Sequence, residues 1–388
     1  HLDRRAEATS ELGKAAGADI AVNGSYFNVK TFEPVTFVLI DKKIVGRTTP
    51  NELMRTNGML AFRDKKGRRM DIFFCDTSEY GQVARRYRSA LAAGPVLIDG
   101  GRIVEYDSDK SFYTGRHPRT LIGKRADGEV VMVVIDGRFK GRGEGATIAE
   151  TAYIARQLGL VEALNLDGGG SSAMALRQPG ASETSLISSP SDGSQRACAN
   201  YIFFTANTPS DGVTAHAVLT PSYRYILPGA STWFSIKGAD ASYGPAEAPS
   251  DLVLEVSNDM GTVEGQTFTA GQKSGSATVT ASNGSVSGAM NVCVTGDVHS
   301  IALQSGGKSV SSVSVKPGQS IDLDALGYHL GQKMASTDTA FTWTVTNGIG
   351  SVDEKGVFTA GSSMANGTLT CSYGNTRASI SVNVGMGD

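Results

Sequence analysis

The residues best suited to chemistry stand at the end of one apolar segment. Segment 162–166 runs into an acid, three glycines and two serines, in the order Asn165-Leu166-Asp167-Gly168-Gly169-Gly170-Ser171-Ser172. Glycine lets a ligand lie against bare backbone, and successive N–H groups in such a loop can form an anion-binding nest. An acid beside an anion nest suggests a substrate that carries a phosphate or a similar group. A tight turn capped by Asp and Ser would explain the same residues, because glycine runs are common in turns.

Two further segments place an arginine at a strand boundary. Arg119 follows His117 and Pro118, and Arg138 follows Asp136 after one glycine. A guanidinium group offers a planar fork that suits bidentate contact with phosphate or carboxylate. An exposed arginine at the start of a strand is the alternative interpretation of Arg119.

An Asn-Gly segment near the N-terminus adds aromatic and amide groups. Asn23 and Gly24 are followed by Tyr26 and Asn28. Such a mixture occurs in sugar sites and also in ordinary turns, where Asn-Gly is a hairpin signal.

Three mechanisms can be compared on these residues. A Ser-His-Asp hydrolase would need His117 as base, but the Gly-x-Ser-x-Gly elbow is absent around Ser171. A Walker-type nucleotide site fails, because no lysine follows Gly170. Carboxylate-assisted glycoside cleavage remains, with Asp136 and Asp167 at apparent strand ends. A phosphate leaving group departs as a stabilised anion, so arginine and N–H donors would supply more of the stabilisation than a general acid.

The elements expected to position these residues are short strands and a few helices. Apolar runs predict strands at 18–22, 121–124, 129–135 and 162–166, and a helix is expected over 3–17. A second helix is predicted from Thr147 to Leu158. Thr147 and Glu150 form a capping box at its start, which gives Glu150 a sufficient structural role.

The chain changes character after a linker at 206–213. Short strands rich in Val, Thr and Ser fill 214–388, and segment 261–271 resembles segment 350–361. This pattern predicts two tandem β-sandwiches, at 214–297 and 298–388, that resemble bacterial Ig-like modules of surface and secreted proteins. The expected fold class is therefore an α+β domain over 1–208, with mixed sheets and a few helices, followed by two all-β Ig-like sandwiches.

Composition limits the partners, membrane segments and disulfides that the chain can have. The chain of 388 residues has a formal net charge of −2 and no long basic block, which disfavours nucleic acid as a partner. No apolar run is long enough to span a bilayer. The four cysteines include no close pair, so they fit either reduced cores or one disulfide, for which Cys75 and Cys198 are available.

Taken together, the segments resemble the phosphodiester glycosidase family. The resemblance rests on five motifs in order, covering most of 18–205: Asn23-Gly24-Ser25-Tyr26-Phe27-Asn28, Ala93-Gly94-Pro95, His117-Pro118-Arg119-Thr120, Asp136-Gly137-Arg138 and the opening segment 165–172. Ser25 stands where the family usually has glycine. The family also has strands before the first motif, so we expect the domain to be N-terminally incomplete in this chain.

The resemblance implies an enzyme that hydrolyses a sugar-1-phosphodiester, such as an α-GlcNAc-1-phosphodiester, to free sugar and a phosphomonoester. It implies that the motifs line one site, with Asp167, Asp136 and Glu150 as catalytic candidates. The substrate-binding candidates are Asn23, Tyr26, Asn28, His117, Arg119, Arg138, Asn165, Gly168, Gly169, Gly170, Ser171 and Ser172. Asp167 is the first choice for the carboxylate at the anomeric carbon, and Arg119 for the phosphate clamp.

Two other functions remain open on the sequence. One is a glycosidase that acts on non-phosphorylated cell-surface or dietary glycans, and the other is a surface adhesin that binds glycans without cleaving them. The sequence requires no cofactor, although acids at this site could hold a divalent cation such as calcium. The Ig-like modules predict a secreted or cell-surface protein attached through them to cell-wall or cell-surface glycans.

Overall fold

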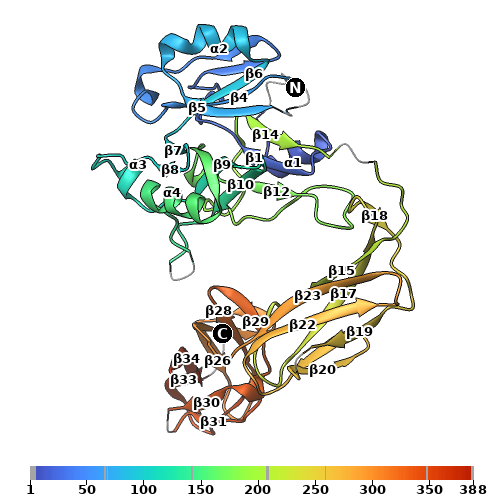
Figure 1. Ribbon diagram of the computed structural model, residues 1–388. Helices are drawn as coiled ribbons and strands as arrows, with labels where there is room; N and C mark the ends of the chain where they lie inside the picture. The colour runs from blue at the N-terminus through green and yellow to red at the C-terminus, as the bar shows by residue number, and fades with distance from the viewer. Residues whose placement is uncertain are drawn as a thin grey trace. The chain divides into compact units, whose positions relative to one another are not determined.

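The computed structural model describes residues 6–64, 67, 69–140, 143–206, 209–257, 259–346 and 348–385 (Figure 1). The chain divides into two compact units, His1–Pro209 and Ser210–Asp388. The boundaries expected from the sequence, 1–208, 214–297 and 298–388, stay predictions. No helix in the described ranges is long and apolar enough to cross a membrane.

The N-terminal unit contains three sheets whose pairings, over the described residues, are all antiparallel. The first sheet has the order β13-β12-β1-β14, with β13 Ser185–Leu186, β12 Met174–Leu176, β1 Ile20–Asn23 and β14 Tyr201–Phe204. The second has the order β10-β9-β11-β7-β8, with β10 Val130–Ile135, β9 Arg119–Arg125, β11 Leu160–Asn165, β7 Val96–Asp99 and β8 Arg102–Ile103. The third has the order β3-β2-β6-β4-β5, with β3 Lys43–Gly46, β2 Val38–Ile40, β6 Ser89–Ala93, β4 Gly58–Phe62 and β5 Met70–Phe74.

The strands predicted around the site are present as β1, β9, β10 and β11. Their apolar residues form the core beneath it: Val22, Ile122, Leu164 and Leu166 are fully buried in the structure. Near-continuous apolar sequence is expected for strands covered on both faces. The same feature made these strands recognisable in the sequence.

Four α-helices occur among the described residues: α1 Thr9–Ala15, α2 Tyr80–Arg86, α3 Ser111–Thr114 and α4 Ile148–Gln157. Short 3-10 turns are η1 Pro50–Glu52, η2 Thr77–Glu79, η3 Gly169–Ser171 and η4 Asp338–Ala340. Helix α4 packs on β7 and β11 through Ala152 and Ala155, which are fully buried.

The helix predicted over 3–17 is shorter in the structure. Helix α1 begins only at Thr9, because Glu7 is extended and forms an antiparallel bridge with Cys198. Residues 3–5 lie outside the described residues. Long-range pairing therefore overrides the helical propensity of this segment.

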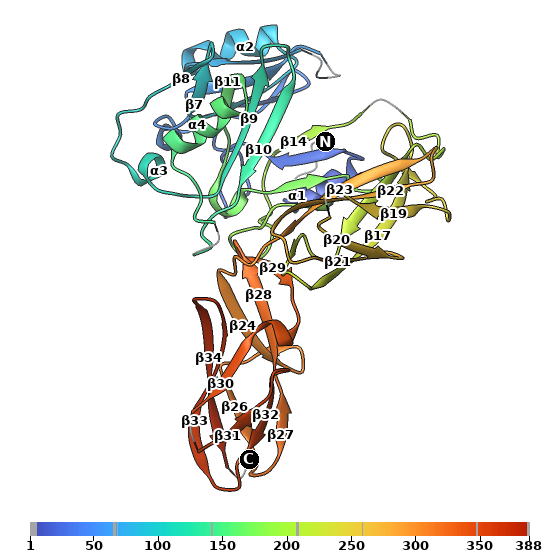
Figure 2. The same cartoon turned by 60° about the horizontal axis from the view of Figure 1, so that its bottom comes forward.

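Over the residues that the structure describes, the C-terminal unit is all-β apart from η4 and is consistent with Ig-like sandwiches (Figure 2). Its first strands are β15 His216–Pro221, β16 Tyr225–Ile226, β17 Ser231–Ala239, β18 Pro245–Ala246, β19 Val253–Val256, β20 Gly261–Glu264, β21 Thr267–Ala270, β22 Gly275–Ser282 and β23 Ser287–Val294. The later strands are β24 Ser300–Ser305, β25 Lys308–Ser309, β26 Ser312–Val315, β27 Ser320–Asp322, β28 Asp324–His329, β29 Gln332–Ala335, β30 Thr342–Val345, β31 Gly350–Val352, β32 Val357–Ala360, β33 Ala365–Tyr373 and β34 Thr376–Val384.

The repeat seen in the sequence forms two matching hairpins in this unit. Hairpin β20–β21 corresponds to β31–β32, and each begins with a glycine at positive φ, 157° at Gly261 and 146° at Gly350. A Cβ at either glycine would stand 2.1 Å from a carbonyl oxygen of the paired strand. Both hairpins therefore need glycine at this position.

All four cysteines are free thiols in the structure, so a Cys75–Cys198 disulfide is not formed. Cys75 is buried against Tyr80 and Val83, and Cys198 is buried beneath the segment that contains Ser171. Burial raises the pKa of both thiols to about 12, which makes them poor nucleophiles.

We therefore expect a reducing agent to leave the thermal unfolding midpoint unchanged. Melting curves recorded with and without dithiothreitol check this expectation, together with non-reducing electrophoresis of the freshly purified protein. A midpoint that falls on reduction would show that the chain depends on a disulfide.

Candidate active site

The second sheet brings three of the predicted segments to one edge. Its register pairs Ile135 with Arg119 and Leu121 with Asn165. The end of β10, the start of β9 and the end of β11 therefore lie side by side. Asp136 and Asp167 follow the two outer strands of this trio. They are two strand spacings apart, which is roughly 10 Å between backbones.

Asn23 joins the first sheet to this edge. Its Oδ1 accepts hydrogen bonds from Thr120 Oγ1 at 2.8 Å and from the Ala173 N–H at 3.1 Å. Its Nδ2 donates to the Asp167 carbonyl oxygen at 2.7 Å, and the Asp167 N–H donates to the Gly24 oxygen at 3.0 Å. All polar atoms of this buried amide are thereby used to hold the loop after β11 against the end of β1.

The three glycines of that loop are needed for close packing. A Cβ on Gly168 would lie 2.8 Å from the Pro118 oxygen, and Gly169 has a φ of +63°. A Cβ on Gly170 would lie 2.0 Å from Asp192 Oδ2. Only glycine avoids these contacts without moving its neighbours.

The N–H groups of the loop are largely committed to the protein itself. The Gly168 N–H donates to Asp167 Oδ1 at 2.9 Å, and the Gly169 N–H donates to the Pro118 oxygen at 2.8 Å. The N–H groups of Ser171 and Ser172 donate to the oxygens of Gly168 and Gly169. In this conformation the loop holds the Asp167 carboxylate, and an anion would depend on side chains for most of its donors.

Asp167 is half-buried, and its surroundings shift the pKa of its carboxyl group in opposite directions. Burial raises the pKa of its carboxyl above the ordinary value, although hydrogen bonds from Ser171 and Gly168 and the charges of Arg55 and Arg196 act in the opposite direction. A desolvated carboxylate held by two donors and flanked by cations is typical of a reactive acid.

Arg119 is deeply buried, with 2% of its surface exposed. Its Nε donates to the Ala146 oxygen at 2.8 Å, and its Nη2 donates to the oxygens of Phe112 and Gly115 at 2.8 and 3.0 Å. Burial lowers the pKa of its guanidinium group to about 10. The structure thus gives Arg119 a role in closing the loop before β9, while its role as phosphate clamp stays a prediction.

Arg138 and Arg196 meet over the glycine loop through Asp192. Arg138 Nη1 lies 3.7 Å from Asp192 Oδ1, and Arg196 Nη2 lies 2.6 Å from Asp192 Oδ2. Arg196 Nη1 also donates to Ser171 Oγ at 3.4 Å. The sequence did not single out Arg196 or Asp192, although their i,i+4 spacing is typical of an ion pair.

Tyr26 and Asn165 form a buried polar pair beside Asp167. The Tyr26 hydroxyl donates to the Gly94 oxygen at 2.6 Å and accepts from Asn165 Nδ2 at 3.3 Å. Burial raises the pKa of Tyr26 well above its usual range. Asn165 Oδ1 is buried and has no hydrogen-bond partner among the described residues.

Asn28 and His117 both make contacts with nearby backbone. Asn28 Oδ1 accepts the Lys30 and Thr31 N–H groups, which closes an exposed turn. His117 contacts the Ser111 oxygen at 3.3 Å, and burial together with the charge of Arg119 lowers the pKa of its imidazole. Ser172 Oγ lies 3.2 Å from Thr120 Oγ1, within hydrogen-bond distance. These contacts give no Ser–His pair.

Asp136 and Glu150 both have structural partners. Asp136 Oδ1 accepts the Ser189 N–H at 2.9 Å. Glu150 completes the predicted capping box with Thr147 and forms an ion pair with Arg116 at 2.5 Å. The Thr147 N–H, aided by Arg116, lowers the pKa of Glu150 below its ordinary value. Their catalytic roles stay predictions.

Replacing Glu150 distinguishes the two roles. We expect Glu150→Ala to reduce the free energy of unfolding by about 1 kcal/mol, because the cap of α4 is lost, and to leave kcat within a few-fold of wild type. Urea unfolding and initial-rate assays check this, with Glu129→Ala as a control that removes only an exposed ion pair to Arg125. A large loss of kcat in a stable variant would assign Glu150 to catalysis.

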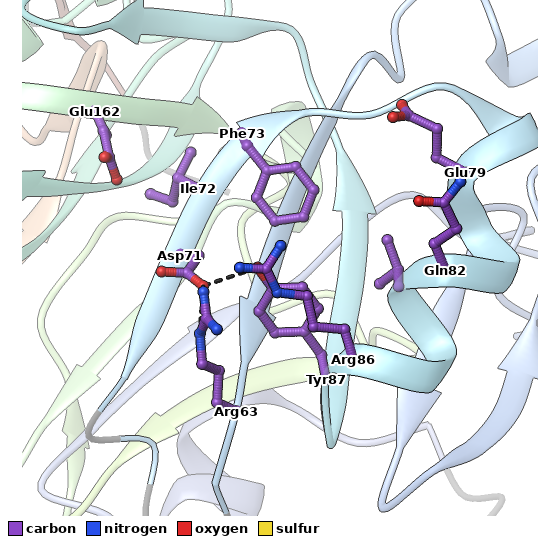
Figure 3. A pocket seen from close by; sticks show the side chains of 10 residues that line it. Arg63, Asp71, Ile72, Phe73, Glu79, Gln82, Arg86, Tyr87 and Glu162 are labelled. Atoms are coloured by element: carbon purple, nitrogen blue, oxygen red, sulfur yellow. Dashed lines mark hydrogen bonds and ion pairs between the residues drawn. The ribbon is translucent and has the colours of Figure 1, made fainter.

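A separate cavity of about 430 Å³ lies against β5 and α2 (Figure 3). Its charged residues largely neutralise one another: Arg63 pairs with Asp71 at 2.7 Å, and the Tyr87 hydroxyl donates to the same carboxylate at 2.8 Å. Glu162, at the upper left of Figure 3, pairs with Lys124 at 2.8 Å. None of the predicted site residues lines this cavity, so we assign the candidate site to the loop after β11.

Among the described residues, three potential metal ligands lie together in the C-terminal unit. Asp297, His299 and His329 lie together there, and hydrogen bonds already join them. His299 Nδ1 also accepts the Leu330 N–H at 3.0 Å. These hydrogen bonds use both ring nitrogens of His299 and Nδ1 of His329, and the group lies outside the unit that contains Asp167.

Comparison with known proteins shows what the N-terminal unit resembles. Residues 16–205, most of this unit, match the model of the phosphodiester glycosidase family. The mouse N-acetylglucosamine-1-phosphodiester alpha-N-acetylglucosaminidase is 26% identical over 203 residues, 50% of this chain and 37% of that protein. An SPbeta prophage-derived uncharacterized protein of Bacillus subtilis is 36% identical over 96 residues, 25% of this chain and 14% of that protein.

A solved structure of the zebrafish enzyme of the same name can also be aligned with this chain. The zebrafish N-acetylglucosamine-1-phosphodiester alpha-N-acetylglucosaminidase catalytic domain, auto-inhibited by pro-peptide, aligns at 20% identity with a TM-score of 0.41, over 53% of this chain and 68% of that chain. The chain thus spans well under half the length of the curated relatives named above.

Proposed function

We propose that the N-terminal unit hydrolyses a sugar-1-phosphodiester to free sugar and a phosphomonoester. The observation that carries the proposal is the Asp167 carboxylate, which is half-buried, held by Gly168 and Ser171 and flanked by Arg55 and Arg196 within the segment that matches the family. A carboxylate beside cations suits an anomeric carbon that bears a phosphate.

In the proposed reaction, the bond between the anomeric carbon and the phosphodiester oxygen breaks, and its electron pair stays on the phosphate. Asp167 acts at the anomeric carbon as nucleophile or as base towards water, and water supplies the hydroxyl of the released sugar. Because the phosphate leaves as an anion, positive charge near it stabilises the transition state more than proton donation would. Asp136, two strands away, is the second carboxylate at this edge.

Isotope incorporation tests the reaction type directly. The protein is incubated with a GlcNAc-1-phosphodiester in water enriched in the heavy oxygen isotope, and the products are analysed by mass spectrometry. We expect the label in the sugar and one phosphomonoester for each sugar released. Label in the phosphate would indicate a phosphodiesterase that breaks the P–O bond. Faster release from an aryl glycoside of the same sugar would favour an ordinary glycosidase, and binding without release would favour an adhesin.

We further propose that the chain acts outside the cell and that the C-terminal unit attaches it to cell-surface glycans. The support is the β-rich C-terminal unit with its repeated hairpins β20–β21 and β31–β32. Sedimentation of the full chain with purified cell walls tests this, with the protein lacking residues 210–388 as the comparison. Equal sedimentation of the two would contradict attachment through this unit.

A further inference from the structure

The arginines near Asp167 differ in how many of their guanidinium nitrogens already donate hydrogen bonds within the protein. Arg119 donates to three backbone carbonyl oxygens and is buried. Arg196 uses all three of its nitrogens, two on Asp192 and one on Ser171. Arg119 therefore has almost no surface that a substrate could reach, and every nitrogen of Arg196 already contacts a side chain of the protein.

Arg55 is the exception among the cations that act on Asp167. Its Nε donates to Glu52 Oε2 at 2.5 Å, and its side chain is 32% exposed. Its Nη1 and Nη2 make no hydrogen bond within the part of the chain that the structure describes. Half of the guanidinium fork is therefore anchored, and the other half is open to a ligand.

Two aromatic rings fix the direction of this fork. The guanidinium carbon of Arg55 lies 4.2 Å from the centre of the Tyr26 ring and 5.5 Å from that of Phe112. Arginine stacks readily on aromatic faces, and a stacked fork loses less conformational freedom when it binds a ligand. Glu52, whose side chain is only 12% exposed, holds the third side.

This arrangement connects Arg55 to the reacting end of β11. Tyr26, on which Arg55 is stacked, exchanges a hydrogen bond with Asn165, two residues before Asp167. The same Asn165 carries the buried Oδ1 that lacks a donor. The open half of the Arg55 fork therefore lies on the ring of a tyrosine whose hydroxyl group contacts the strand that leads to Asp167.

We propose that Arg55 binds the phosphate group of the substrate through Nη1 and Nη2 and thereby makes the site prefer phosphodiesters to plain glycosides. The inference rests on the proposed function. Its chemistry is electrostatic: as the bond from the anomeric carbon to oxygen breaks, the electron pair moves to the phosphate, and Arg55 faces the oxygens that gain charge.

The test compares Arg55→Gln and Arg55→Lys with wild type. We expect Arg55→Gln to lower kcat/KM for a GlcNAc-1-phosphodiester by about 10- to 100-fold and to weaken competitive inhibition by inorganic phosphate by a similar factor. Inhibition by free N-acetylglucosamine should change by less than about 3-fold. Arg55→Lys should lie between the two, since lysine keeps the charge but loses the bidentate geometry.

Arg88→Gln is the matched control. Arg88 also donates through Nε to one acid, Asp41 at 2.6 Å, and its side chain is similarly exposed at 39%. It belongs to none of the site segments, so we expect wild-type kinetics. Melting curves for all variants check that they fold.

The outcomes separate this inference from the proposed function. An active wild type with unchanged kinetics and phosphate inhibition in Arg55→Gln would contradict the role of Arg55 alone. Equal weakening of sugar and phosphate inhibition would indicate a merely structural role. If wild type releases no sugar, the proposed function fails, and calorimetric titration with inorganic phosphate still tests Arg55: binding that Arg55→Gln abolishes supports the site, and unchanged or absent binding refutes it.

Discussion

Replacing Asp167 with asparagine is expected to reduce kcat by roughly 10²–10⁴-fold, because the carboxylate that acts at the anomeric carbon is lost. The substitution keeps the size of the side chain, and an amide Oδ1 can still accept the Gly168 N–H that now bonds the carboxylate at 2.9 Å. Sugar release from a GlcNAc-1-phosphodiester measures the effect. Wild-type turnover in a folded Asp167→Asn protein would remove Asp167 from the mechanism.

The same substitution has a predicted effect on stability. Burial raises the folded-state pKa of Asp167, so the ionised carboxylate is less favourable in the folded than in the unfolded chain. Below the unfolded-state pKa the carboxyl group is protonated in both states and costs no stability. As pH rises from the unfolded-state pKa through the folded-state pKa, ionisation of Asp167 lowers the free energy of unfolding. We expect Asp167→Asn to unfold at the same or a higher temperature than wild type at neutral pH, and the difference to shrink in acid.

Asp71 provides a control, because its pKa is shifted in the opposite direction to that of Asp167. Burial would raise the pKa of Asp71, but hydrogen bonds from Tyr87 and Arg63 lower it below the ordinary value. Asp71→Asn should therefore destabilise the protein at neutral pH and leave kcat unchanged, because Asp71 lies outside the candidate site. Thermal melts and rate profiles across the acid range for both variants complete the comparison.

The kcat/KM of wild type should fall in acid with an apparent pKa above that of an ordinary aspartate.

The segments around the site were predictable where local pattern and packing agree. Strand β11 has an apolar sequence because it is buried, and the glycines after it are required by the approach of Pro118 and Asp192. The capping box at Thr147 depends on residues three apart and was predicted correctly. By contrast, the helix expected over 3–17 is cut short by a bridge to Cys198, a partner nearly two hundred positions away.

The side-chain environment of the site was not predictable from the pattern. Arg119 directly follows a proline and Arg138 directly follows a glycine, whereas Arg55 stands between Met54 and Thr56. Whether an arginine is free or saturated depends on carbonyl groups supplied by distant loops, such as Ala146 for Arg119. The Glu52–Arg55 spacing was the one available signal, and i,i+3 ion pairs are too common on surfaces to indicate a site.

Gly94 links the packing of the site to its chemistry, and its replacement is the second large effect we expect. A Cβ at Gly94 would lie 2.3 Å from the Arg55 carbonyl oxygen and 2.9 Å from the Asn57 nitrogen, both backbone atoms that cannot rotate away. The Gly94 oxygen also accepts hydrogen bonds from Tyr26 and Asn165. Gly94→Ala should therefore push the segment that carries Arg55 away from Tyr26.

We expect Gly94→Ala to lower the free energy of unfolding by about 1–3 kcal/mol, as overpacking does in well-packed interiors, and to raise KM for the phosphodiester substrate. Gly81→Ala is the matched control, because a Cβ at Gly81 within α2 would meet no atom within 4 Å. Alanine there should stabilise the helix by up to about 1 kcal/mol without changing KM. Urea unfolding and steady-state kinetics of both variants test this prediction. If Gly94→Ala is as stable and active as Gly81→Ala, the backbone at 55–57 moves without a loss of stability. Close packing against Gly94 then does not position Arg55.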